Sequence, residues 1–390
     1  MLGIKTMVRD TRDLLGGTGQ IKPGRGMTTS VIALTLAALC VLGVLALHFP
    51  QYLTTPDLRE RVPLGALRQL VFFSLLVAGS LSLANLVLGR RRSINAAAFL
   101  LVAAAVALGG SWVQVHDFPT HTPYLGVDWF IVDLLISVAV FAAIEKAFPM
   151  RKAQAVFRRA WQTDIVHFGV NHLFVGLSLL TVNFLIFHLF GWLERDSVHA
   201  FVGAIPFIPQ LLLCLVVADL AEYWSHRAYH QIPFLWKFHA VHHSTETMDW
   251  LAGSRLHLLE LVTTRVVVLA PLYILGFDKG VLDTYVVIIG IQATLIHTNV
   301  RLPWGPLRYL LVTPDFHHWH HSSDDEAIDK NYAGSLAFLD YLFGTAVKSD
   351  KALPEKYGVL GDYMPDGFVR QQLFPFQQLL TSRRAAAAAA

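Results

Sequence analysis

The chain has 390 residues, of which 54% are hydrophobic and only 15% are charged. Soluble domains typically carry about 25% charged residues, so this composition excludes a disordered chain, a coiled coil and an ordinary soluble enzyme, and it favours a multi-span membrane protein. The net charge of +3 is too small to indicate a nucleic-acid partner. The two cysteines, Cys40 and Cys214, lie in apolar runs and offer neither a disulfide framework nor a cysteine-type zinc site.

Long apolar runs predict the membrane-spanning helices, since about 20 apolar residues are needed to cross a bilayer. Six such runs cover residues 31–49, 70–88, 96–113, 127–144, 165–192 and 208–224. A later apolar pair, 258–276 and 281–296, is separated by the turn-like Phe277-Asp278-Lys279-Gly280 and is expected to dip into the membrane and return as a helical hairpin. The predicted fold class is therefore all-α: a polytopic membrane protein with about six spans, the hairpin and a cytosolic, histidine-rich helical cap.

Basic residues indicate the orientation, because cytoplasmic loops are enriched in Lys and Arg. They precede the first run and follow the second and fourth runs, whereas the loop 114–126 has no Lys or Arg. This pattern predicts a cytoplasmic N-terminus and puts the residues from His226 onward on the cytoplasmic side. The first run is too long for the core of a signal peptide. The excess of Arg over Lys and the short loops favour a bacterial inner membrane, with the endoplasmic reticulum as the alternative.

Three regions follow from this pattern. Residues 1–155 hold four spans without obvious chemistry, and residues 156–346 hold two spans, the hairpin and all the clustered histidines. Residues 347–390 are expected to form a cytosolic C-terminal tail that ends in a low-complexity run of alanines.

Eleven of the 18 histidines lie between His226 and His321, and most of them belong to three motifs with helical spacing. Members of each motif are three or four residues apart, so they share one face of a helix. Neutral imidazole is the commonest metal ligand in proteins, and nine candidates exceed the four positions of one tetrahedral site. The sequence therefore predicts a site for two metal ions. The nine candidate ligands are His226, His230, His239, His242, His243, His297, His317, His320 and His321.

Other residues receive a weaker assignment. A helix is expected to begin with Thr313 as N-cap and Pro314 at its first position, which turns His318 away from the face of its neighbours. His257 is a candidate tenth ligand. A ligating histidine usually gives its second ring N–H to a carboxylate or carbonyl, so Asp219, Glu222 and Asn331 are candidates for that supporting role.

His167 and His172 lie in or at the end of the fifth run, where a polar residue is expensive, and whether they join the site stays open. Clustered imidazoles at a membrane face suit a redox metal that activates dioxygen, because a lipid C–H bond offers no leaving group and no acidic proton to an acid–base pair. No catalytic residue beyond the metal ligands is predicted.

The histidine spacing, together with the stretch Asp329-Lys-Asn-Tyr332-Ala-Gly-Ser-Leu-Ala-Phe-Leu-Asp340-Tyr-Leu-Phe-Gly-Thr345, resembles the fatty acid hydroxylase/sterol desaturase superfamily over residues 210–346. The resemblance implies a membrane enzyme with two non-haem iron ions on the cytosolic side, bound by the nine histidines named above. It implies that dioxygen is the co-substrate and that one C–H bond of a lipid is hydroxylated or two are desaturated. It also implies an external electron donor, a reductase or a small carrier.

One departure from the family pattern concerns the residues after His297. Some members have a further histidine there, whereas this chain reads Thr298-Asn299-Val300-Arg301. Either His257 substitutes for it, or one iron has a different set of ligands.

Two alternatives belong to other functional classes. A membrane b-type haem protein explains histidines near the spans, but axial ligation uses one histidine on each face of the haem and does not explain the adjacent pair His242-His243. A histidine-rich metal transporter or sensor needs polar groups at mid-membrane, whereas these clusters follow the sixth span. The class of lipid and the choice between hydroxylation and desaturation stay open.

Overall fold

The computed structural model describes residues 26–389 apart from 117–121, 123, 350 and 362–363. Every regular element in the described residues is helical, which confirms the all-α prediction. The chain divides into two compact units. The first comprises the described residues up to Leu135 together with 155–162 and 172–177, and the second comprises 136–154, 163–171 and the described residues from Ser178 on.

Among the residues that the structure describes, seven helices are long and apolar enough to cross a membrane. They cover Thr29–His48, Leu64–Val87, Arg92–Trp112, Val127–Ala147, Phe207–Gln231, Leu258–Leu275 and Lys279–His297. A bent pair, Trp161–Leu173 with Leu177–Leu193, passes the same test together and turns by 56° at its break. By length and composition these helices match the six predicted spans and the hairpin.

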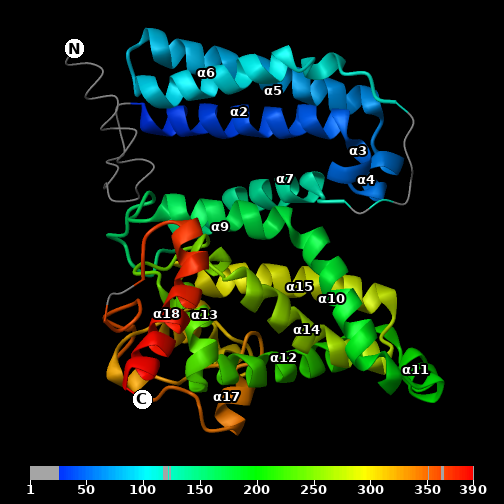
Figure 1. Ribbon diagram of the computed structural model, residues 1–390, viewed down its shortest axis with the longest axis vertical. Helices are drawn as coiled ribbons and strands as arrows, with labels where there is room; N and C mark the ends of the chain where they lie inside the picture. The colour runs from blue at the N-terminus through cyan, green and yellow to red at the C-terminus, as the bar shows by residue number, and fades with distance from the viewer. Residues whose placement is uncertain (1–25, 117–121, 123, 350, 362–363, 390) are drawn as a thin grey trace. The chain divides into compact units, whose positions relative to one another are not determined.

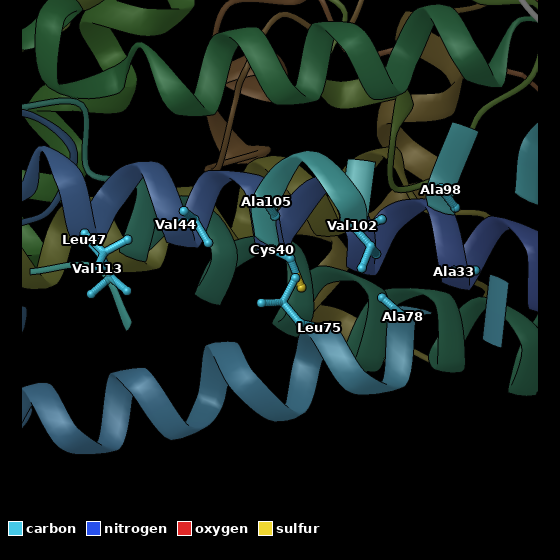
Figure 2. Packing of buried hydrophobic residues seen from close by; sticks show 11 residues of the cluster. Ala33, Cys40, Val44, Leu47, Leu75, Ala78, Ala98, Val102, Ala105 and Val113 are labelled. Atoms are coloured by element: carbon cyan, nitrogen blue, oxygen red, sulfur yellow. The ribbon is translucent and has the colours of Figure 1, made fainter. Parts of the chain in front are cut away.

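Three helices of the first unit, α2 (Met27–His48), α5 (Leu64–Val87) and α6 (Arg92–Ala107), lie side by side (Figure 1). Their contact faces carry small buried residues, among them Ala33, Ala78 and Ala98, around Cys40 and Val44 (Figure 2). Small side chains allow helix backbones in a membrane to approach closely. Shorter helices complete this part of the chain: α3 (Pro50–Leu53), α4 (Pro56–Arg61) and the 3₁₀ turn Gly110–Trp112.

A buried polar cluster links the same three helices. Asn95 donates to the Ser30 hydroxyl at 2.7 Å and to the carbonyl of Arg90 at 2.9 Å, and Asn85 donates to the side-chain oxygen of Asn95 at 3.2 Å. These amides satisfy one another across α2, α5 and α6, so the cluster stabilises the packing.

The remaining helices follow in chain order. They are α7 (Val127–Ile136), a π-helical turn (Ser137–Ala142), α8 (Ala143–Ala147), α9 (Trp161–Leu173), α10 (Val175–Phe190), α11 (Asp196–Gly203), α12 (Phe207–Gln231), α13 (Pro233–His243), α14 (Leu258–Leu275), α15 (Lys279–His297), α16 (Pro314–His320), α17 (Phe338–Leu342) and α18 (Phe368–Ala389). Single 3₁₀ turns cover Gly191–Leu193, Ala252–Ser254, Gly305–Tyr309 and Asp325–Ala327.

The helical hairpin is made by α14 and α15, which pack with α12 around a shared apolar core (Figure 1). Its turn requires glycine at position 276. Gly276 has a φ of 70°, and a Cβ there would lie 2.4 Å from the ring of His199. His199 itself donates from Nε2 to the carbonyl of Ile274 at 3.1 Å, so the ring is held against the turn.

A second core of the same unit joins the cap to the membrane helices. Tyr223 of α12 and Ile296 of α15 pack against Phe316 of α16 and against Tyr332 and Leu339 of the following segment. The predicted start of α16 is confirmed: Thr313 is the N-cap, its hydroxyl accepts from the backbone N–H of Phe316, and Pro314 is the first helical residue. This core packs α16 against α15 and brings it close to Tyr223 of α12.

Candidate metal centre

The structure brings the nine candidate histidines together as two groups, in each of which the ring nitrogens facing one another lie within 4.8 Å. One group comprises His226, His230, His239, His243 and His320, and the other comprises His242, His297, His317 and His321. Eight of the nine are buried and His230 is partly exposed. Two groups match the number of metal ions expected from the sequence.

The short helices α13 and α16 each contribute histidines to both groups. In α13, His239 and His243 are one helical turn apart and belong to the group of five histidines, while His242 belongs to the group of four. In the motif of α16 the numbers are reversed: only His320 belongs to the group of five, while His317 and His321 belong to the group of four. Helical spacing predicts a shared face, and the structure shows that each helix contributes histidines to both groups, whose rings are in contact at His243 and His321.

The facing atoms are mostly Nε2 atoms in close contact. In the group of four histidines, His297 Nε2 lies 3.3 Å from His242 Nε2, 3.0 Å from His317 Nε2 and 3.2 Å from His321 Nε2. In the group of five histidines, His239 Nε2 lies 3.0 Å from His226 Nε2 and 3.1 Å from His243 Nε2. Two nitrogens each about 2.1 Å from one ion, at about a right angle, lie about 3.0 Å apart.

Backbone carbonyls determine which nitrogen of four of these rings carries the proton. The Nδ1 atom of each ring lies within hydrogen-bond distance of a carbonyl oxygen: His226 with Tyr332 at 2.7 Å, His242 with Arg255 at 3.0 Å, His297 with Ala293 at 2.6 Å and His320 with Lys330 at 2.9 Å. A carbonyl can only accept, so Nδ1 must donate, and a neutral ring then has a bare lone pair on Nε2. These lone pairs face one another and repel unless a cation lies between them.

Two further ring nitrogens support the same conclusion. The Nε2 atoms of His230 and His320 are buried and have no hydrogen-bond partner. Buried polar atoms are rarely left unpaired in proteins, and metal coordination supplies the missing interaction. The residues therefore fit two metal ions.

Burial and the neighbouring rings keep the histidines of the α13 and α16 motifs neutral. Burial, followed by the neighbouring imidazoles, holds the pKa of His243, His317 and His321 well below its usual value. The pKa of His239 and His242 is lowered in the same way, first by burial and then by adjacent rings. Neutral imidazole is the form that binds metal.

Glu260 is a supporting carboxylate that the sequence analysis did not assign. Its Oε1 accepts from Nδ1 of His239 at 2.6 Å, and both side chains are buried. The available signal was the position of Glu260 in the first turn of an apolar helix, where an acid is costly and often functional.

Two of the three predicted supporting residues, Asp219 and Asn331, bond to the backbone of other segments. Asp219 accepts from the backbone N–H groups of Ser335 and Leu336 at 2.8 and 2.7 Å. Asn331 donates to the carbonyl of Phe316 at 2.8 Å and accepts from the N–H of Val347 at 2.7 Å. These bonds hold the segment whose Tyr332 carbonyl orients His226.

Glu222 lies beside the same segment: a Cβ at Gly334 would lie 3.3 Å from Glu222 Cγ. Asp340 folds this segment by accepting from the backbone N–H groups of Tyr332 and Ala333, both at 2.8 Å. Segment 329–345, which carries part of the family resemblance, therefore positions His226 of α12 through the carbonyl of Tyr332.

His257 lies outside both groups. Its Nδ1 accepts from the N–H of Leu259 at 3.1 Å, which caps α14, and its Nε2 donates to the carbonyl of Gln372 at 2.9 Å. The two groups hold five and four histidines, and His257 belongs to neither.

His318, His167 and His172 are also placed elsewhere. His318 Nε2 lies 3.0 Å from the carbonyl of Thr298, and burial lowers the pKa of His318 to about 3. His167 bonds to Gln371 at 2.9 Å, and His172 pairs with Asp133.

The chain is similar to enzymes that modify lipids. A family model for fatty acid hydroxylases matches residues 211–345, which include all nine grouped histidines. An ornithine lipid hydroxylase of Rhizobium tropici is 27% identical over 262 residues, covering 64% of this chain and 76% of that protein.

Two other relatives match shorter stretches. Human alkylglycerol monooxygenase is 35% identical over 127 residues, which is 33% of this chain and 28% of that protein. A very-long-chain aldehyde decarbonylase of Oryza sativa is 28% identical over 155 residues, which is 39% of this chain and 58% of that protein. The chain thus spans less than two thirds of the length of these two. No solved structure matches.

Proposed function

We propose that the chain, whose residues 211–345 match a family model for fatty acid hydroxylases, is a membrane oxidoreductase that uses dioxygen to hydroxylate or desaturate a lipid. We assign the nine grouped histidines as ligands of two non-haem iron ions. The observation that carries the proposal is the convergence of bare Nε2 atoms in two adjacent groups.

When bound, the two irons supply the redox chemistry with dioxygen that an unactivated C–H bond requires. The chain's own residues hold and orient the ligands. Carbonyls of Tyr332, Arg255, Ala293 and Lys330 keep the Nδ1 protons in place, so each Nε2 lone pair points to the metal position. Glu260 holds the proton on Nδ1 of His239 and partly offsets the positive charge of the site.

The geometry argues against the haem alternative. Axial haem ligands approach the iron from opposite faces of a flat macrocycle. Here three Nε2 atoms, those of His297, His317 and His321, lie within 3.2 Å of one another and leave no room for a macrocycle. A transporter or sensor is likewise disfavoured, because the family relatives are lipid-modifying enzymes.

The site's surroundings are part of the proposal. We place the histidine groups on the cytoplasmic side of a bacterial inner membrane, on the strength of the arginine-rich loops that flank the spans. The substrate is then a membrane lipid, and the electrons come from a separate reductase or carrier protein.

Comparative lipid mass spectrometry tests this function. The full chain and its His297→Ala variant are expressed in the same bacterial host, and the membrane lipids are compared under dioxygen. We expect one lipid species that gains an oxygen atom, or loses two hydrogen atoms, only with the unchanged chain. Identical lipid profiles, with metal bound in the unchanged chain, would contradict the proposal.

A further inference from the structure

The C-terminal helix α18 presents three different faces. One face, with the buried Gln371 and Pro375, packs on the protein. At the border of the exposed apolar face, Phe376 contacts Phe238 of α13, the helix that lies beside α18 in Figure 1. Two other faces are exposed. At about 100° per residue, the exposed apolar residues lie within about 60° of one another, and the exposed polar residues are centred about 90° away.

The apolar face is a narrow, continuous stripe. Its residues follow the spacing of one helix side, and their exposed fractions are large for apolar side chains: Val369 66%, Leu373 51%, Phe376 44% and Leu380 58%. The exposed polar face carries Arg370, Gln377 and Thr381. A helix with separate apolar and polar stripes is typical of one that lies in the plane of a membrane surface.

Contacts of Gln372 set the level of α18 relative to the membrane. Its side chain donates to the carbonyl of Leu256 at 3.0 Å and accepts from the N–H of Leu258 at 2.9 Å. Its carbonyl accepts from Nε2 of His257 at 2.9 Å. Leu258 is the first residue of the spanning helix α14, so these bonds hold α18 where that span begins, at the boundary between water and hydrocarbon.

We propose that α18 is an interfacial helix, with Val369, Leu373, Phe376 and Leu380 in contact with membrane lipid. The polar stripe then faces water, and Arg370 at its N-terminal end suits anionic headgroups. Since Phe376 also contacts Phe238 on α13, the lipid surface adjoins the helix that carries three of the grouped histidines. The inference goes beyond the proposed reaction and does not depend on it.

A fluorescent probe that reports polarity tests the inference. Leu373→Cys and its matched control Thr381→Cys are labelled in the full chain and reconstituted in phosphatidylcholine–phosphatidylglycerol vesicles, with or without spin-labelled lipid. The unchanged chain gives the background, because Cys40 and Cys214 are buried. We expect the probe at 373 to emit at shorter wavelength and to be quenched by the spin-labelled lipid several-fold more strongly than the probe at 381.

Two outcomes would overturn the inference. Equal emission and equal quenching at both positions would mean that the stripe faces water. A short-wavelength emission at 373 without quenching by lipid would mean that protein covers it. Leu380→Cys, compared with the same Thr381→Cys control, repeats the measurement, so that one badly folded apolar-face variant does not decide it.

Discussion

Metal binding at this site depends on which ring nitrogen of each histidine carries the proton. Carbonyl acceptors assign that proton to Nδ1 in His226, His242, His297 and His320. The spacing of the histidines in the sequence cannot predict these bonds, because the carbonyls come from Tyr332, Arg255, Ala293 and Lys330, and only Ala293 shares the histidine's own helix.

Removing one ligand separates the two groups experimentally. His297 has Nε2 contacts to the three other members of its group, so we expect His297→Ala to lose one of the two irons and the lipid oxidation. Metal analysis of the purified variant checks this. His188→Ala is the matched control, because that exposed ring bonds to the carbonyl of Phe184 outside both groups. Full iron content in His297→Ala would contradict its role as a ligand.

Glu260 tests the supporting contacts. Glu260→Gln keeps a side-chain oxygen near Nδ1 of His239 but removes the negative charge. Such changes next to a metal ligand typically lower metal affinity or activity by about 10–100-fold. Chelator competition on the purified protein measures the loss, and we expect Glu260→Ala to lose more than Glu260→Gln. Unchanged iron retention in both variants would show that the contact does not support the site.

At the scale of helices, repeated spacing in the sequence predicts the carriers of the site. The i, i+3 and i+4 histidines of α13 and the N-cap Thr313 of α16 were both expected, and the structure confirms the start of α16. The division of each motif between two groups was not predictable, because it depends on how α13 packs against α12 and how α16 packs against α15. The helix α18 was missed since its segment is polar and interrupted by Pro375.

The α14–α15 hairpin makes a stability prediction. Gly276→Ala puts a side chain into the left-handed region, which costs about 1–2 kcal/mol, and also forces the His199 ring away. We expect a lower thermal midpoint for the detergent-solubilised variant. Gly290→Ala is the control, because that exposed helical position has open space around it and alanine favours helix by up to about 1 kcal/mol. Equal midpoints for the two variants would refute the packing described for the turn.

At the scale of the whole chain, hydropathy predicted the number of membrane helices well. Apolar length alone is sufficient for this, because an uninterrupted apolar run has few alternatives to a spanning helix. The predicted run 208–224 was too short, since α12 continues to Gln231 and carries His226 and His230 beyond the apolar part. The division of the chain at residue 155 and the sidedness of the site stay predictions.

Sidedness has a direct test. The loop 114–126 is expected outside and the segment around Asp325 inside, because of the distribution of basic residues. Gln114→Cys and Asp325→Cys are both at exposed positions. In spheroplasts, whose inner membrane is intact, we expect a membrane-impermeant thiol reagent to label only position 114. Labelling of position 325 before permeabilisation would reverse the orientation.

The central claim is that the two histidine groups bind two iron ions. Metal analysis of the full chain, purified at low oxygen after expression with added iron, tests this most directly. We expect close to two irons per chain, and one fewer in His297→Ala. A chain that holds only zinc under these conditions, or no metal at all, would contradict the account.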